Sequence, residues 1–76
     1  MFEAIKSLMI EALNLPADKL TPTAHLADDL GIDSLDAAEL IMELEDVYTL
    51  KITEEQAATF VTVGDIVSFI EAQKAS

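Results

Sequence analysis

Ser34 is the residue whose type and setting are best suited to covalent chemistry in this sequence. It follows Asp33 at the start of a predicted helix, where a hydroxyl is exposed and unpaired backbone N–H groups favour a nearby anion such as a phosphodiester. Between Lys19 and Lys51 there is no Lys or Arg. The acids in that interval are Asp28, Asp29, Asp33, Asp36, Glu39, Glu43, Glu45 and Asp46. We interpret Ser34 as a covalent attachment point and the acids as a docking surface. The alternative for Ser34 is an ordinary residue at the start of a helix, and the alternative for the acids is that they serve solubility.

Two other kinds of chemistry fit the sequence poorly. A serine hydrolase needs a base beside its nucleophile, but the single histidine, His25, lies in a predicted loop and no Gly-x-Ser-x-Gly turn surrounds Ser34. A calcium-binding EF-hand loop over residues 28–39 would place leucine and isoleucine at ligand positions and aspartate where glycine is required. The sequence therefore predicts neither an enzyme nor a specific metal site. His25 is interpreted as a residue that packs or hydrogen-bonds locally.

The composition indicates one small acidic domain over residues 1–76. It has no Cys, so stability must come from apolar packing, which 51% hydrophobic residues can supply. A formal net charge of −11 disfavours binding to nucleic acid or anionic membranes and favours partners with basic patches. No stretch approaches the about 20 apolar residues of a membrane span, and the start lacks the pattern of a signal peptide. We expect a cytoplasmic monomer.

Hydrophobic periodicity predicts an all-α fold, a small four-helix bundle with three principal helices and one short third helix. The helices are expected at about residues 2–13, 34–48, 53–60 and 62–73, with a long loop at 16–32 between the first two. Pairs of residues that suit helix starts are Asp33 with Asp36, Thr53 with Gln56, and Thr62 with Asp65. Local sequence signals thus place Ser34 in the first turn of the second helix.

Helical spacing also predicts which side chains face the core. In the second helix these are Ala37, Leu40, Ile41, Leu44, Val47 and Tyr48. A thinner apolar stripe of Leu35, Ala38 and Met42 is flanked by acids, so it is harder to bury completely. The apolar loop residues Leu15, Leu20, Leu26, Leu30 and Ile32 are expected to hold the loop against the core.

The chain resembles the acyl carrier proteins, specifically the free-standing bacterial type used in fatty acid synthesis. The resemblance covers nearly the whole length, including the first helix and the long loop. Its most specific parts are Leu26-Ala27-Asp28-Asp29-Leu30-Gly31-Ile32-Asp33-Ser34-Leu35-Asp36 and Glu39-Leu40-Ile41-Met42-Glu43-Leu44-Glu45-Asp46. An Asp-Ser-Leu triplet alone is weak, but at a helix start in an acidic chain of this length it is specific.

The resemblance implies that Ser34 carries phosphopantetheine, attached by a phosphopantetheinyl transferase that uses coenzyme A and Mg²⁺. The terminal thiol would hold acyl groups as thioesters and present them to fatty acid synthesis enzymes with basic docking patches. By position, the implied docking residues are Asp33, Leu35, Asp36, Glu39, Met42, Glu45, Asp46 and Glu54. The implied acyl-pocket residues are Ile52, Ala57 and Phe60. From its helical spacing alone, Met42 could also be a residue at the boundary of the core.

Three positions depart from the common pattern of that family. Ala38 stands where the family often has Val, Lys51 replaces a usual acid, and Thr53 takes the place of a frequent Pro. These departures leave attachment at Ser34 intact but affect which partners and chain lengths are preferred. Two alternatives stay open: a dedicated carrier for polyketide, malonyl or amino-acyl transfer, and an unmodified acidic helical interaction protein.

Overall fold

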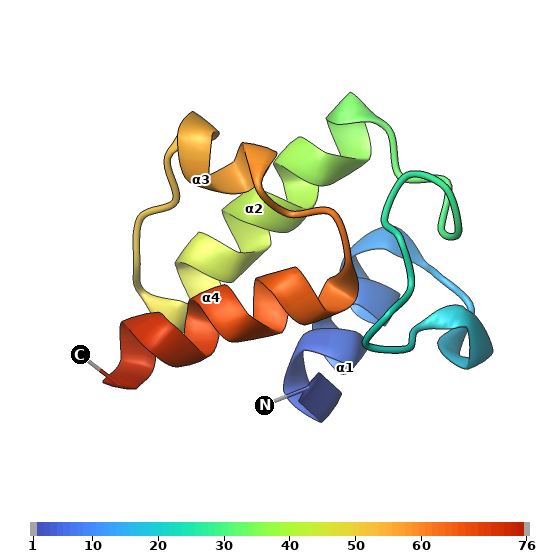
Figure 1. The fold of residues 1–76 in the computed structure, drawn as a ribbon, viewed down its shortest axis with the longest axis horizontal. Helices are drawn as coiled ribbons and strands as arrows, with labels where there is room; N and C mark the ends of the chain where they lie inside the picture. The colour runs from blue at the N-terminus through green and yellow to red at the C-terminus, as the bar shows by residue number, and fades with distance from the viewer. Residues whose placement is uncertain (1, 76) are drawn as a thin grey trace.

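Helices account for the regular structure of residues 2–75, which are the residues that the computed structural model describes. They are α1 (Phe2–Leu13), the short 3₁₀ helix η1 (Ala17–Lys19), α2 (Ser34–Tyr48), α3 (Glu54–Ala58) and α4 (Val63–Ala75). The all-α fold with a short third helix is confirmed. In Figure 1 the long loop between α1 and α2 lies on the right, opposite the C-terminal end of α4 on the left. No helix among the described residues is long and apolar enough to cross a membrane.

The ends of the helices follow from local capping. Asp33 accepts a hydrogen bond at its side chain from the Asp36 N–H (2.9 Å), so α2 begins where predicted. Thr53 and Gln56 form a complete capping box, with bonds of 2.9 and 3.1 Å. α3 ends two residues earlier than predicted, where the N–H groups of Thr59 and Phe60 donate to carbonyls only three residues back (3.1 Å each) and the Thr59 hydroxyl donates to the Gln56 carbonyl (2.7 Å). α4 continues two residues beyond the predicted end.

One core joins the three long helices and the loop. α1 packs against both α2 and α4. The most deeply buried side chains are Ile5, Met9, Leu20, Leu40, Leu44, Val63, Ile66 and Ile70. From the loop, Leu20, Leu26 and Ile32 are buried while Leu15 and Leu30 pack partly buried against the core, so the predicted anchoring of the loop is confirmed. One core assignment in α2 is wrong: Val47 is 55% exposed, because it lies at the edge of the interface with α1 and faces a groove there.

Backbone hydrogen bonds tie the loop to the start of α4. The Leu26 N–H donates to the Val61 carbonyl (2.9 Å), the Val63 N–H to Ala24 (3.1 Å), and the Gly64 N–H to Pro22 (2.9 Å). An isolated antiparallel bridge between His25 and Thr62 lies among these bonds. Together they form a short backbone contact between the loop and the start of α4, which we call the seam. The loop is long, but this seam fixes its path across the protein.

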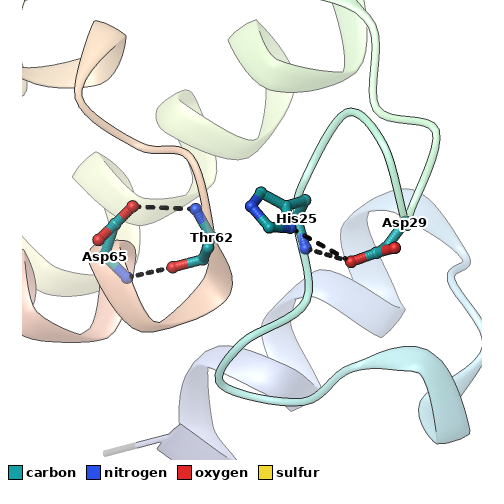
Figure 2. Close-up of polar contacts among 4 residues, drawn as sticks. All are labelled: His25, Asp29, Thr62 and Asp65. Carbon is teal, nitrogen blue, oxygen red and sulfur yellow. Dashed lines mark hydrogen bonds and ion pairs between the residues drawn. The ribbon is translucent and has the colours of Figure 1, made fainter.

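On each side of this seam, side chains hydrogen-bond to backbone N–H groups three or four residues away (Figure 2). His25 donates its backbone N–H to Asp29 Oδ2 (2.8 Å), and its Nδ1 lies 3.5 Å from the same oxygen. The local hydrogen-bonding role predicted for His25 is therefore confirmed. On the α4 side, the Asp65 N–H donates to the Thr62 hydroxyl (3.2 Å) and the Thr62 N–H returns a bond to Asp65 Oδ2 (3.0 Å). This reciprocal pair is the capping arrangement expected from the sequence.

Replacing Gly64 with alanine is expected to destabilise the fold through the seam. A Cβ atom at this position would lie 2.8 Å from the Pro22 carbonyl oxygen, which also accepts the Gly64 N–H. Because backbone must shift to relieve the contact, we expect a loss of about 1–3 kcal/mol in the free energy of unfolding, measured by urea denaturation. Gly31→Asn is the control: Gly31 has φ +67° with open space around it, and Asn tolerates that conformation, so a smaller loss is expected. Equal losses would contradict the steric explanation.

Acid is expected to weaken the start of α4 through Asp65. Hydrogen bonds from the backbone N–H groups of Thr62 and Val61 hold the pKa of the Asp65 carboxyl below its usual range. A carboxylate with a lowered folded-state pKa contributes stability above the unfolded-state pKa and loses it as the pH falls through the folded-state pKa. Asp65→Asn keeps an acceptor but cannot titrate, so the stability difference between the two proteins should shrink over that acidic range. A difference that is independent of pH in thermal melts would contradict this role.

Candidate functional site

The segment before α2 holds Ser34 in a defined position. Gly31 takes a left-handed conformation (φ +67°), after which Ile32 is buried and donates its N–H to the Leu26 carbonyl (2.9 Å). Asp33 then caps the helix, and Ser34 is its first residue, with an exposed side chain. A buried isoleucine and a helix cap thus fix the backbone on the N-terminal side of an exposed hydroxyl.

The first turn of α2 can accept an anion on this hydroxyl. The first N–H groups of a helix have no intrahelical acceptor, and the Asp33 side chain accepts that of Asp36, while the Ala37 N–H makes the first helical bond, to the Asp33 carbonyl. The N–H groups of Ser34 and Leu35 precede them, at the positive end of the helix dipole. An exposed hydroxyl next to such donors fits a phosphodiester link.

An open groove of about 730 Å³ runs from Ser34 between α2 and α3. Its lining is mostly apolar and consists of Ser34, Ala37, Ala38, Ile41, Met42, Ile52, Thr53, Glu54, Ala57 and Ala58. The α2 members follow the spacing i, i+3, i+4, i+7 and i+8, so they lie along one helix face. An apolar chain attached at Ser34 can therefore lie along α2 with α3 on its other side. The small Ala38 side chain leaves this groove wider than a Val would.

A second, smaller hollow of about 310 Å³ lies on the loop side of Ser34. It is lined by residues of the loop, including Leu26 and Ile32, and by Phe60 and Val61 from the α3–α4 connection. Ser34 lines both the groove and this smaller hollow. Of the three predicted acyl-pocket residues, Ile52 and Ala57 line the groove and Phe60 lines the smaller hollow. The ring of Phe60 also meets that of Phe69 edge to face, with centroids 5.4 Å apart.

Most of the residues predicted for docking are exposed on the α2 side of the protein. Those with exposed side chains are Asp33, Leu35, Glu39, Met42, Asp46 and Glu54, while Asp36 is half-buried. Leu35 is 81% exposed and Met42 66% exposed, so Met42 is not a core residue. Two large apolar side chains surrounded by acids are unusual on a free surface and are typical of a protein contact site.

Glu45 differs from the other predicted docking residues. Its carboxylate accepts a hydrogen bond from the Ile52 N–H (2.8 Å) across the turn that follows α2, and the side chain is half-buried. Its carbonyl also accepts from the N–H groups of Thr49 and Leu50. Glu45 therefore positions Ile52 against the groove, a role that helix periodicity could not reveal because its partner lies seven residues away.

Other residues of the groove were also missed by the sequence interpretation. Ile41 was assigned to the core but lines the groove while half-buried, and Thr53 was seen only as a helix cap. The spacing of Ile41, seven residues after Ser34, is the signal that could have placed it there. Among residues 2–75, no group of three or more His, Asp or Glu side chains is arranged to hold a metal ion.

Comparison with known proteins agrees with these features. The family described as "Phosphopantetheine attachment site" matches residues 3–70. An acyl carrier protein of Helicobacter pylori strain J99 is 47% identical over 74 residues, which cover 97% of this chain and 95% of that protein.

Proposed function

Because the chain belongs to the acyl carrier protein family, whose members carry phosphopantetheine covalently and are not themselves catalysts, we propose that Ser34 is its attachment residue. The single observation that carries the proposal is an exposed serine hydroxyl at the N-terminus of α2, at the mouth of a mostly apolar groove. In the attachment reaction, the Ser34 oxygen forms a bond to the pantetheine phosphorus of coenzyme A. The 3′,5′-ADP portion leaves, and the hydroxyl proton passes to a base on the transferase.

The attached arm supplies a thiol that this chain lacks, since its sequence has no Cys. An acyl group bound to that thiol as a thioester has two places to lie, in solvent or in the groove between α2 and α3. Ile52 and Ala57 line the groove opposite α2, so burial of an apolar chain there is favoured by roughly 0.8 kcal/mol per CH₂ group. Phe60 lines the smaller hollow on the loop side of Ser34.

We further propose that the carrier serves fatty acid synthesis. Support comes from the run of residues 33–40 and from the similarity to a free-standing acyl carrier protein over nearly the full length of both chains. The partners would be a phosphopantetheinyl transferase and synthesis enzymes with basic patches that face the exposed acids of α2. A dedicated carrier for polyketide, malonyl or amino-acyl transfer is the nearest alternative.

The test is reconstitution with purified enzymes. The chain is converted with a transferase and coenzyme A, and intact mass is recorded before and after adding malonyl-coenzyme A and an acyl-thioester primer together with a malonyl transferase and a ketoacyl synthase from bacterial fatty acid synthesis. One phosphopantetheine, followed by malonyl and then elongated acyl masses, is expected. Conversion to the phosphopantetheine form without elongation by the ketoacyl synthase would favour a dedicated carrier, and an unchanged starting mass would overturn the carrier proposal itself.

Reversing an acid on α2 is expected to slow association with these enzymes. Glu39 and Asp46 have exposed side chains, so changing either to lysine removes an attraction for a basic patch without disturbing the core. We expect association rates for the ketoacyl synthase to fall by roughly threefold to tenfold at low salt, measured by stopped-flow fluorescence. Glu71→Lys on α4 makes the same charge change away from α2 and serves as the control. Equal slowing by the control would assign the effect to net charge alone.

A further inference from the structure

A second groove lies between α1 and α2, apart from the groove that begins at Ser34. Its volume is about 430 Å³. Its apolar part includes Leu8, Ala12 and Val47, and acids line it at Glu11, Glu39 and Glu43. It shares no lining residue with the groove between α2 and α3. α2 therefore presents one face to each groove.

The groove is lined by one row of side chains from α1 and one from α2. On α1, the lining residues from Ala4 to Ala12 are spaced as i, i+3, i+4, i+7 and i+8. On α2, Glu39, Glu43 and Val47 are spaced four apart and form a second row. Each row spans nine residues, a rise of about 12 Å, which matches roughly two turns of a further α-helix lying along the groove.

Val47 makes this surface unusual. Its place in the apolar stripe of α2 predicts burial, yet 55% of the side chain is exposed to solvent. None of the residues that line the groove is basic. At one end of the groove, the Nζ of Lys74 lies 5.6 Å from the centroid of the Tyr48 ring. Among residues 2–75, no element of opposite charge covers this apolar strip and its bordering carboxylates along most of the groove.

We propose that the groove between α1 and α2 docks an amphipathic helix of a partner protein. The apolar ridge of that helix would pack on the exposed Val47, with the nearly buried Leu8 forming the floor, and its flanking Lys or Arg side chains would lie opposite Glu11 and Glu43. Charge complementarity selects this occupant, because a second copy of the chain, with net charge −11, or an anionic lipid surface would bring negative charge against the acids. The site does not involve Ser34, so a partner can bind there whether or not the arm is attached.

The probe for this surface is a fluorescent synthetic peptide of leucine and lysine, with its leucines at i, i+3, i+4 and i+7. A scrambled peptide of the same composition is the control for charge. Fluorescence anisotropy at physiological salt should show binding of the ordered peptide and at least fivefold weaker binding of the scrambled one. Equal binding by both peptides would overturn the proposal, since nothing more than charge attraction would be involved.

Two aspartate substitutions decide where the ordered peptide binds. Val47→Asp adds a negative charge, so binding by charge alone would become tighter, whereas loss of the apolar contact should weaken binding by about fivefold. Met42→Asp makes the equivalent change on the other face of α2, where 66% of the side chain is exposed. The proposal expects weakening from Val47→Asp and little change from Met42→Asp. The reverse pattern would place the peptide in the groove at Ser34 and overturn it.

NMR amide shifts of the unmodified chain provide a second measurement that does not depend on affinity. Binding of the peptide should shift Ala4, Ser7, Leu8 and Val47 and leave α3 unchanged. Both variants are first checked by circular dichroism, and their exposed positions make folding the expected result. Sedimentation at the same concentration tests the other occupant: a dimer that is lost in Val47→Asp would show that a second copy covers this face and would overturn the proposal.

Discussion

A chain with Ser34 replaced by alanine is expected to gain no mass when incubated with a phosphopantetheinyl transferase, coenzyme A and Mg²⁺. The physical reason is that the transferred phosphorus must be attacked by a hydroxyl that the transferase can reach and orient. Ser34 is exposed, follows a helix cap and stands among the acids of the first turn of α2. The wild-type chain should gain one phosphopantetheine, as measured by intact mass spectrometry.

Two other serines provide matched controls for this result. Ser7 on α1 and Ser68 on α4 are also exposed, so exposure alone does not distinguish them from Ser34. Both stand inside helices, where the neighbouring backbone N–H groups are already bonded to carbonyls. The variants Ser7→Ala and Ser68→Ala should therefore be modified fully. An adduct on Ser34→Ala, or its loss in either control, would show that the attachment site is elsewhere.

Replacing Glu45 with alanine is expected to lower the free energy of unfolding. The substitution leaves the buried Ile52 residue with a backbone N–H that has lost its 2.8 Å acceptor. An unsatisfied, partly buried donor costs about 1–3 kcal/mol. In a domain of this size each kcal/mol lowers the melting temperature by roughly 4–8 °C, so the change is visible in a thermal melt.

Neighbouring substitutions separate this structural role from charge. Glu45→Gln retains an oxygen acceptor and should recover most of the stability while removing the charge. Asp46→Ala removes a charge from an exposed side chain next along the helix, and its melting temperature should stay near that of the wild type or rise. If Glu45→Gln were as unstable as Glu45→Ala, the hydrogen bond to Ile52 would not be the cause.

The Glu45 result bears on function because Ile52 lines the groove opposite α2. Loss of the hydrogen bond should loosen the turn after α2 and with it one wall of the groove. A stability loss in Glu45→Ala is therefore expected together with weaker protection of a bound acyl thioester from hydrolysis. Slower association with enzymes and unchanged stability would instead indicate a docking role like that proposed for Glu39.

Features that rest on interactions within one helical turn could be predicted from the amino-acid sequence. Asp33 and Thr53 cap the helices they were expected to begin, and the start of α2 at Ser34 follows from the first of these. Side chains that cap a helix bond to N–H groups two or three residues away, so a short stretch of sequence contains both partners. The all-α class and the acidic surface around Ser34 are equally local properties.

The tertiary structure alone decided what depends on residues far apart in the chain. The Gly64 position requires glycine because Pro22 approaches it, and the propensity of α4 does not reveal that contact. Val47 fits the core pattern of α2, but whether it is covered depends on how closely α1 packs. For Ser34, local signals fixed the exposed hydroxyl at the helix start, whereas the packing of α2 against α3 and the loop set the two hollows beside it. Hydrophobic periodicity predicts which side chains share one face of a helix. Which other helix or loop contacts that face depends on the packing of the whole domain.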